Sequence, residues 1–402
     1  MSGPLIPEFF SADSSSFRPS AIRAFAHLIN DPRIISFAGG LPSPATFPAG
    51  MIAEVAADVL RERKEVALQY GPTAGLPRLR GAISSIASAR GIRCTAESVL
   101  ISTGSQQALH LVATVLLDPG DVVLVELPAY VGGLSAFYGR SAQLVGVRQD
   151  EDGIDPADLR SKAAQVRREG KRLKALYTIP NFQNPSGRLL SAARRAEVLA
   201  IAWEERFLII EDDPYGELRF DESAVTRPIA ADDPELEHVI YLGSFSKVLA
   251  PGLRCGFVVA AAPILQRVQL AKEAADLCSG MLDQCIVDEI CERDLLRDQI
   301  ARVRSFYEER AAALLTALET SFAGRAKWTD VRGGLFTFLT LDDESIDTRA
   351  LVPRAVEAGV IFVPGSAFFV DGSGANAMRL TFAKEPDDRM REGIARLARL
   401  IS

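Results

Sequence analysis

The sequence has few of the residues on which metal sites and disulfide frameworks depend. Among its 402 residues there are only three histidines, none at the spacing of a metal-ligand pair, so we expect no histidine-based metal site. The five cysteines are an odd number and include no Cys-x-x-Cys pair. This usage indicates reduced thiols, as in a cytosolic protein, rather than disulfides.

Long apolar runs and blocks of like charge are also missing. The first residues, MSGPLIPEFFSADSSSF, lack the basic start and apolar run of a secretion signal, and no later stretch is apolar enough to span a bilayer. Acidic and basic residues are mixed along the chain and give a formal net charge of -7. Nucleic acid and membrane are therefore poor candidates as partners, and we expect a cytoplasmic protein.

The apolar residues that are present predict a large α/β protein. From about residue 97, short apolar runs alternate with helical stretches; the runs are SVLIST, DVVLVE, AQLVGV, LKALYT, RFLIIE, HVIYLG and CGFVVA. Runs this apolar, separated by helices, indicate a mostly parallel sheet of seven strands covered on both faces. A long helical stretch follows over residues 288–322, and then come further strand-like pieces, GGLFTFLTL, VIFVPG and AMRLTF.

A chain of this length is too long for one compact core, so we expect two lobes. We place a large domain over residues 46–285, and the interdomain helix with a smaller α/β domain over residues 286–402. An N-terminal segment, residues 1–45, is expected to pack on the smaller domain.

Polar motifs follow the predicted strands. They are TGSQQ, ELPAY, NFQNPSG, EDDPYG and SFSK, and each begins where an apolar run ends. In open α/β sheets the ligand crevice lies at the carboxyl ends of the strands. The placement therefore predicts one convergent site.

Two of these motifs suit a phosphorylated heterocycle. Gly104, Ser105 and Gln106 open a helix whose free N–H groups suit a phosphate, although an ordinary helix N-cap would look the same. Asp212 could pair with a protonated ring nitrogen, and Tyr215 could hydrogen-bond a ring oxygen. The alternative is a solvated acidic loop.

The motif SFSK places an amine beside hydroxyls and a guanidinium. Lys247 lies close in sequence to Ser244, Ser246 and Arg254, as in a site for a dianionic phosphate, although a lone lysine is usually a surface cation. Asn184 belongs to an Asn-Pro-Ser-Gly turn, and its amide could point into the site or serve only the turn.

In their joint order and spacing these motifs resemble the fold type I pyridoxal phosphate (PLP) enzymes, specifically the class I/II aminotransferases. The resemblance runs from ISFAGGLPSPATFP to MRLTF. The strings FAGGLPSPATFP, QNPSG, GSFSKVLAPGLR and VPGSAFF are most similar to the 2-aminoadipate and kynurenine aminotransferase group. The resemblance implies PLP as the cofactor, held by the large domain.

The resemblance also implies a role for each motif residue. Lys247 would form a Schiff base with the cofactor aldehyde and later carry the substrate's α-proton. Asp212 would face the pyridine nitrogen, Tyr215 and Asn184 the ring 3-oxygen, and Tyr130 would stack on the ring. The phosphate would be held by Gly104, Ser105, Gln106, Ser244, Ser246 and Arg254.

Substrate and partner contacts follow from the same resemblance. Arg379 would bind the α-carboxylate bidentately, and the other substrate contacts would be Asn184, Gly39 and Gly40. Tyr70 would reach the phosphate of the neighbouring subunit, which implies a homodimer. Ser20 and Arg23, in PSAIRAF, match a short helix that reads a distal carboxylate in this group; the alternative is a solvent-facing helix arginine.

The resemblance predicts an aminotransferase that moves an amino group between an L-amino acid and a 2-oxo acid by a ping-pong mechanism. Glutamate and 2-oxoglutarate would be one pair, and 2-aminoadipate or an aromatic or branched amino acid would supply the other. A fold type I lyase or decarboxylase would use the same cofactor residues and stays open. The effector-binding domain of a transcription regulator is disfavoured, because PSAIRAF begins by residue 19 and the charge does not suit DNA.

Overall fold

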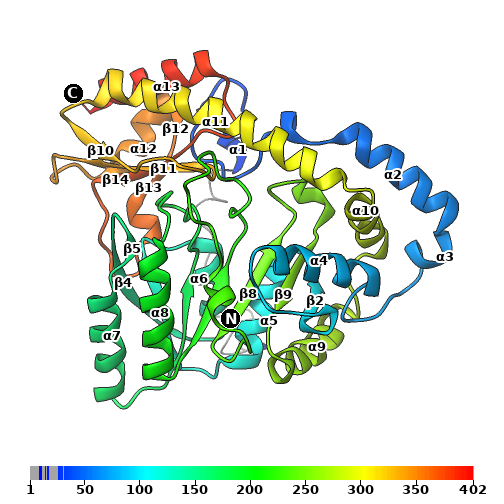
Figure 1. The fold of residues 1–402 in the computed structure, drawn as a ribbon. Helices are drawn as coiled ribbons and strands as arrows, with labels where there is room; N and C mark the ends of the chain where they lie inside the picture. Colours follow the sequence, from blue (N-terminus) through cyan, green and yellow to red (C-terminus); the bar gives the residue numbers. More distant parts are fainter. Residues whose placement is uncertain (1–8, 11–13, 15, 18–25, 30, 402) are drawn as a thin grey trace, which may run out of the picture.

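The computed structural model describes residues 9–10, 14, 16–17, 26–29 and 31–401. A large β-sheet with helices packed on it occupies one part of the molecule, and a smaller sheet with its own helices lies beside it (Figure 1). This arrangement confirms the predicted α/β fold class.

The large sheet contains all seven predicted strands and one more. Its order is β2-β9-β8-β7-β6-β3-β4-β5, which makes eight strands. The additional strand, β5, has only two residues and turns back antiparallel onto β4, so it leaves no apolar run in the sequence. The strands are β2 (Val99–Ser102), β3 (Val122–Leu127), β4 (Gln143–Asp150), β5 (Gly153–Ile154), β6 (Leu173–Thr178), β7 (Leu208–Asp212), β8 (Val239–Ser244) and β9 (Gly256–Val259).

Burial explains why these strands have continuous apolar runs. Every residue of β2 and β9 is buried, as are nearly all of β3 and β8, because helices cover the sheet. Helices α7 and α8 pack together and against β3, β6 and β7, whereas α5 packs with α6 and α9 and against β8 and β9 (Figure 1). These helices are α5 (Ser105–Leu116), α6 (Val131–Tyr138), α7 (Pro156–Arg168), α8 (Ala192–Glu205) and α9 (Ala262–Asp276).

A second group of helices lies beyond the β2 edge of the large sheet (Figure 1). Helix α10 contacts α2, α3 and α4. Their bounds are α2 (Ala49–Glu62), α3 (Lys64–Ala67), α4 (Pro77–Ala89) and α10 (Met281–Glu292). Short 3-10 helices cover Pro44–Thr46, Ala96–Ser98, Ile229–Asp232, Pro251–Leu253 and Gly365–Phe368.

The smaller sheet is antiparallel and has the strand order β10-β11-β14-β13. Helices α11 and α13 pack against each other above it (Figure 1). Near the N-terminus, β1 pairs in parallel with β12. The elements are α1 (Ala26–Ile29), β1 (Ile35–Ser36), α11 (Leu295–Phe322), β10 (Ala326–Trp328), β11 (Phe336–Leu341), α12 (Thr348–Glu357), β12 (Val360–Ile361), β13 (Val363–Pro364), β14 (Ala377–Thr381) and α13 (Asp387–Leu400).

The long helix predicted over residues 288–322 is wrong in one respect, because it is interrupted. Helix α10 ends at Glu292 and α11 begins at Leu295. Asp294, between them, has a φ of 54°, a left-handed conformation that a right-handed helix cannot contain. The predicted domain boundary after residue 285 falls inside α10, and the domain limits stay predictions. Among the described helices, none is both long and apolar enough to cross a membrane.

Candidate active site

The predicted polar motifs meet at one edge of the large sheet. Strands β3, β6, β7 and β8 run parallel, so their carboxyl ends share this edge. Strand β9 runs antiparallel to both β8 and β2, so it begins where they end. Gly256, its first residue, pairs with Ser244 on one side and with Ser102 on the other. The segments after β2 and β8 are therefore neighbours, although they are far apart in sequence.

The end of β2 leads into the N-terminus of α5 through Gly104. This residue has a φ of 78°, and a Cβ added to it would overlap the guanidinium of Arg254. Arg254 donates from Nη2 to the backbone oxygen of Thr103 at 3.1 Å. Glycine thus lets a cation lie against the free N–H groups of the helix. Such an arrangement is suited to a phosphate.

The predicted hydroxyls and amide lie around the same helix end. Ser244 donates from Oγ to Ser246 Oγ at 2.9 Å, and Ser105 is the first residue of α5. Gln106 donates from Nε2 to the backbone oxygen of Gly132 at 2.8 Å, which ties α5 to the start of α6.

Lys247 lies in the turn after β8, with its amine inside the molecule. Its Nζ donates to the backbone oxygen of Gly40 at 3.2 Å and lies 6.0 Å from the ring centroid of Tyr215. Burial, helped by the positive charge of Arg379 and opposed by Asp212, lowers the pKa of Lys247 to about 8. A useful fraction of this amine is therefore neutral near physiological pH.

Asp212 ends β7 and is buried. One carboxylate oxygen, Oδ2, accepts a hydrogen bond from the Tyr177 hydroxyl at 2.9 Å, while the buried Oδ1 has no partner within the described part of the chain. Burial raises the pKa of Asp212 to about 7 against the opposing hydrogen bond from Tyr177. An open acceptor of this kind is suited to a positively charged N–H group.

Asn184, Tyr215 and Arg379 form one hydrogen-bonded chain. Asn184 donates from Nδ2 to the Tyr215 hydroxyl at 3.4 Å, and its Oδ1 accepts from Arg379 Nη1 at 2.9 Å. Arg379 also donates from Nη2 to the backbone oxygen of Ala38 at 2.6 Å. The large sheet and β14 of the smaller sheet therefore contribute to a single site.

Arg379 is fully buried, and no acidic side chain among the described residues pairs with it. Its guanidinium carbon lies 4.4 Å from the ring centroid of Phe336 and 5.2 Å from that of Phe368. Burial lowers the pKa of Arg379 to about 10, and its Nε has no partner among the residues that the structure describes. An uncompensated buried cation is costly, so this position is suited to an anionic ligand.

The other predicted site residues differ in how close they lie to this set of side chains. Tyr130 is half-buried at the start of α6, after β3. A Cβ built on Gly40 would lie 3.8 Å from Arg379 Nη1, so Gly40 borders the site. A Cβ built on Gly39 would instead lie 3.5 Å from the side chain of Ile29. Tyr70 is 79% exposed and does not pack into the site of its own chain. The two residues predicted to read a distal carboxylate, Ser20 and Arg23, lie outside the described residues.

Two buried polar residues next to the site were not predicted from sequence. Tyr177 binds Asp212, and Glu126 accepts hydrogen bonds from Thr178 Oγ1 at 2.8 Å and Gln183 Nε2 at 3.0 Å. Burial raises the pKa of Glu126 to about 7. The only signal in the sequence is an acidic residue at the end of the apolar run DVVLVE.

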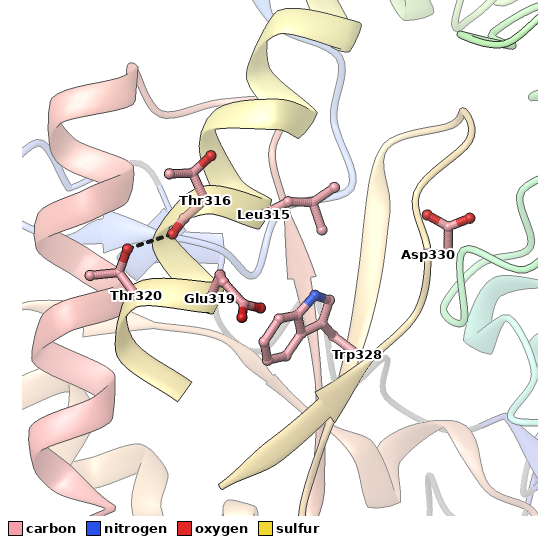
Figure 2. Close-up of a pocket in the computed structure, with 6 residues that line it drawn as sticks. All are labelled: Leu315, Thr316, Glu319, Thr320, Trp328 and Asp330. Carbon is pink, nitrogen blue, oxygen red and sulfur yellow. Dashed lines mark hydrogen bonds between the residues drawn. The ribbon is translucent and has the colours of Figure 1, made fainter. Parts of the chain in front are cut away.

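Two hollows lie outside this set of residues. A shallow one is between α11 and β10, where Thr320 and Thr316 are hydrogen-bonded beside Trp328 (Figure 2). A cavity of about 840 Å³ has Gly187 and Arg188 on one side and Lys327 on the other. Neither hollow is lined by Lys247, Asp212 or Arg379.

The residues present fit each part of PLP. An amine, Lys247, is available for the aldehyde, and the unpartnered oxygen of Asp212 for the pyridinium N–H. The N-terminus of α5 with Arg254 offers a cradle for the phosphate.

Comparisons with known proteins agree with this fit. Residues 34–397 match the family model described as aminotransferase class I and II. The aromatic-amino-acid aminotransferase 1 of Thermococcus litoralis is 40% identical, over 98% of this chain and 94% of its own. The 2-aminoadipate transaminase of Thermus thermophilus is 41% identical, over 98% and 96%.

A solved structure extends the agreement to the fold. The crystal structure of the Pyrococcus horikoshii kynurenine aminotransferase, in complex with PMP, is 38% identical and superposes with a TM-score of 0.93, over 98% of this chain and 97% of its own. These matches confirm the predicted resemblance. The chain belongs to the class I and II aminotransferase family and is a fold type I, PLP-dependent aminotransferase.

Proposed function

We propose that this enzyme exchanges amino groups between glutamate and 2-oxoglutarate as one pair and a second amino acid and its 2-oxo acid as the other, by a ping-pong mechanism. The second amino acid is 2-aminoadipate or an aromatic or branched one; the names of the relatives support the first two of these. The observation that carries this proposal is the buried Arg379, without an acidic partner among the described residues, next to the backbone that binds Lys247.

The proposed cofactor contacts follow from the positions of the side chains. Asp212 holds the positive pyridine nitrogen, Tyr215 and Asn184 contact the 3-oxygen, and Tyr130 stacks on the ring. When bound, PLP supplies a conjugated, positively charged ring that takes up the electron pair released at the substrate Cα. The phosphate is held by Gly104, Ser105, Gln106, Ser244, Ser246 and Arg254.

The proposed substrate contacts orient the bond that breaks. Arg379 binds the α-carboxylate in a bidentate manner, beside Asn184 and the two glycines Gly39 and Gly40. Because Gly40 lies near Arg379 and its backbone oxygen accepts from Lys247 Nζ, a carboxylate held here brings Cα toward the lysine amine. Lys247 Nζ then takes the proton from Cα, which its lowered pKa of about 8 permits at neutral pH.

The proposed assembly is a homodimer in which Tyr70 completes the phosphate site of the other subunit. Its high exposure supports this role, as do the exposed apolar side chains nearby in sequence, Leu60, Val66 and Leu68. Arg23 and Ser20 are proposed to bind the distal carboxylate of acidic substrates.

The function is tested by spectroscopy of the half-reactions. The purified protein is supplied with PLP, and its near-ultraviolet and visible absorption is recorded before and after L-glutamate is added without a 2-oxo acid. We expect glutamate to remove the band of the lysine-bound cofactor and 2-oxoglutarate to restore it.

The controls separate the two parts of the proposal. Lys247→Ala should bind PLP reversibly and show no such band. A wild-type band that glutamate leaves unchanged, while an aromatic or branched amino acid removes it, would refute the glutamate pair. The absence of any band in the wild type would refute the roles given to Lys247 and Asp212.

A further inference from the structure

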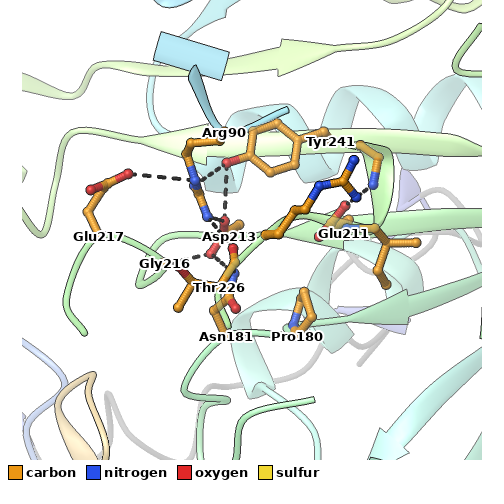
Figure 3. A network of polar contacts seen from close by, with 12 residues as sticks. Arg90, Pro180, Asn181, Glu211, Asp213, Gly216, Glu217, Thr226 and Tyr241 are labelled. Carbon is orange, nitrogen blue, oxygen red and sulfur yellow. Dashed lines mark hydrogen bonds and ion pairs between the residues drawn. The ribbon is translucent and has the colours of Figure 1, made fainter. Parts of the chain in front are cut away.

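Asp213 is a buried carboxylate that the roles proposed above do not use. It directly follows β7, and its side chain is shielded from solvent. Oδ1 accepts from Asn181 Nδ2 and from the backbone N–H of Gly216, each at 2.9 Å. Oδ2 accepts from the Tyr241 hydroxyl at 3.1 Å and lies 2.6 Å from Arg90 Nη2 (Figure 3). Both oxygens are therefore fully used.

The hydrogen-bond donors of Asp213 come from different parts of the chain. Asn181 is in the segment after β6, Gly216 closes the turn after β7, and Tyr241 is in β8 (Figure 3). Each of these segments leads within a few residues to a proposed site residue. One carboxylate thus joins the segments that carry Asp212, Asn184, Tyr215 and Lys247.

The turn that contains Tyr215 depends most directly on this carboxylate. Its closing bond is the one from Gly216 N–H to Asp213. A Cβ on Gly216 would lie 2.7 Å from Asp213 Oδ1 and would overlap the Arg90 guanidinium, so only glycine permits this approach. The same contact holds the backbone next to Tyr215, whose hydroxyl accepts from Asn184.

Arg90 supplies the charge that balances Asp213, and its Nε also lies 3.6 Å from Glu217 Oε1. It follows α4, donates from Nη1 to the Tyr241 hydroxyl at 2.7 Å and donates from Nη2 to the backbone oxygen of Thr226 at 2.9 Å. Burial alone would lower the pKa of Arg90, but the negative charge of Asp213 raises it. The pKa of Asp212 is raised mainly by burial, and the negative charge of Asp213 raises it further.

We infer that Asp213, with Arg90 as its counter-ion, is a positioning residue that fixes the three segments, after β6, β7 and β8, that bear the proposed cofactor and proton-transfer residues. The inference rests on the proposed function, because it concerns the placement of those residues. It adds two residues that no substrate or cofactor contact requires.

Three substitutions test the pair. Asp213→Asn replaces a carboxylate oxygen, which accepts from Arg90 and Tyr241, by an amide N–H₂ group, which only donates. Arg90→Gln leaves Asp213 without its counter-ion. For both variants we expect PLP affinity to fall at least about tenfold and kcat/KM about 100-fold, since small misplacements of reacting groups have effects of this size. Arg90→Lys keeps the charge and should recover part of both losses.

A pH readout distinguishes positioning from a general loss of stability. Arg90→Gln leaves an extra negative charge, so the pH at which the lysine-bound cofactor changes its absorbance should rise; Asp213→Asn removes a negative charge, so that pH should fall. A purely structural contact would lower the melting temperature in both variants without these opposite shifts. The other ionisable groups acting on Asp212 and Lys247 are the same in both variants: Glu126, Tyr177, Tyr215, Arg254 and Arg379.

Asp221→Asn is the matched control. Asp221 pairs with Arg332 at 2.7 Å, but about half of its side chain is exposed, so this variant should behave like the wild type. Asp213→Asn with wild-type PLP affinity and an unshifted pH profile would overturn the inference while leaving the proposed function intact. A wild-type chain that fails to bind PLP would overturn both.

Discussion

At the scale of the residue, the site consists of ionisable side chains buried before any ligand arrives. The Oδ1 atom of Asp212 has no partner, and Arg379 has no acidic partner among the described residues. Buried charges without partners reduce the stability of the folded state. In the roles proposed here, bound cofactor and substrate supply the missing partners, so part of the stability of the protein depends on its ligands.

Asp212→Asn should stabilise the ligand-free protein above pH 7. Asp212 has its pKa raised from 3.8 to about 7, so the folded protein binds this proton more tightly than the unfolded chain. Relative to the unfolded chain, the folded protein therefore loses stability as pH rises from 3.8. The full destabilisation by the charged Asp212 carboxylate is reached above pH about 7. Removing the charge should raise the free energy of unfolding at pH 8 by on the order of 1–4 kcal/mol.

Thermal unfolding without PLP at pH 5.5 and pH 8 measures this gain, which should be larger at pH 8. Transaminase activity of the same variant should fall at least about 100-fold, because nothing then holds the ring nitrogen charged. A lower melting temperature at pH 8 would contradict the prediction.

How far the sequence predicts the site depends on the kind of residue. Lys247, Asp212 and Asn184 stand in polar motifs after apolar runs, and the structure brings them together as expected, although their roles stay predictions. Tyr177 lies inside the apolar run LKALYT, whereas Glu126 ends the run DVVLVE and opens the motif ELPAY, so neither position by itself indicates its contacts. Their contacts depend on which strands are neighbours, and a single sequence does not contain that order.

At the scale of the element, the connection from β8 to β9 brings two proposed functions onto one segment. It carries Lys247 after β8 and Arg254 just before β9, and β9 returns beside β8. The run CGFVVA predicted this strand but not its antiparallel direction, because apolar pattern does not encode direction. The amine and the guanidinium are thereby held at a fixed separation.

Gly104→Ala should weaken PLP binding, whereas Gly120→Ala should not. The two glycines have positive φ values of 78° and 86°, so each substitution should strain the backbone. Gly104 also has a ψ of 166°, a combination that essentially only glycine adopts, so the strain there should be about 1–3 kcal/mol. Only the methyl group at Gly104 would meet the Arg254 guanidinium; at Gly120 nothing lies within 4 Å.

Fluorescence titration with PLP should show an affinity at least about tenfold lower for Gly104→Ala, since about 1.4 kcal/mol corresponds to a factor of ten. Thermal unfolding without PLP should show a loss of stability in both variants. Equal PLP affinities in the two variants would count against the phosphate cradle.

At the scale of the whole molecule, the two sheets contribute opposite sides of one site, and the proposed dimer contributes a third component. Tyr70 is 79% exposed in the single chain. The described chain therefore leaves one proposed phosphate contact to be supplied from outside. The dimer and the cytoplasmic location stay predictions.

Mixed dimers test whether Tyr70 acts across the interface. Tyr70→Phe and Lys247→Ala homodimers should both be impaired, the first mainly in PLP affinity. A heterodimer of the two variants, purified through different tags, contains one site with an intact Lys247 and an intact partner tyrosine. It should recover about half of the wild-type activity per dimer.

Recovery only to the Tyr70→Phe level would mean that the tyrosine acts within its own chain. Trp203→Phe is a suitable control, because it also changes an exposed aromatic residue, here on α8. This variant should leave PLP affinity unchanged.

The strand order also has a consequence for biosynthesis. Strand β2 ends at Ser102, and its one neighbour in the large sheet is β9, which ends at Val259. At about 5–20 residues per second, the ribosome needs roughly 10–30 s to supply that neighbour. During this time the four residues of β2, which are all buried in the folded protein, have no neighbouring strand to pair with. A nascent chain stalled before β9 should therefore be an effective client for chaperones that recognise exposed apolar segments.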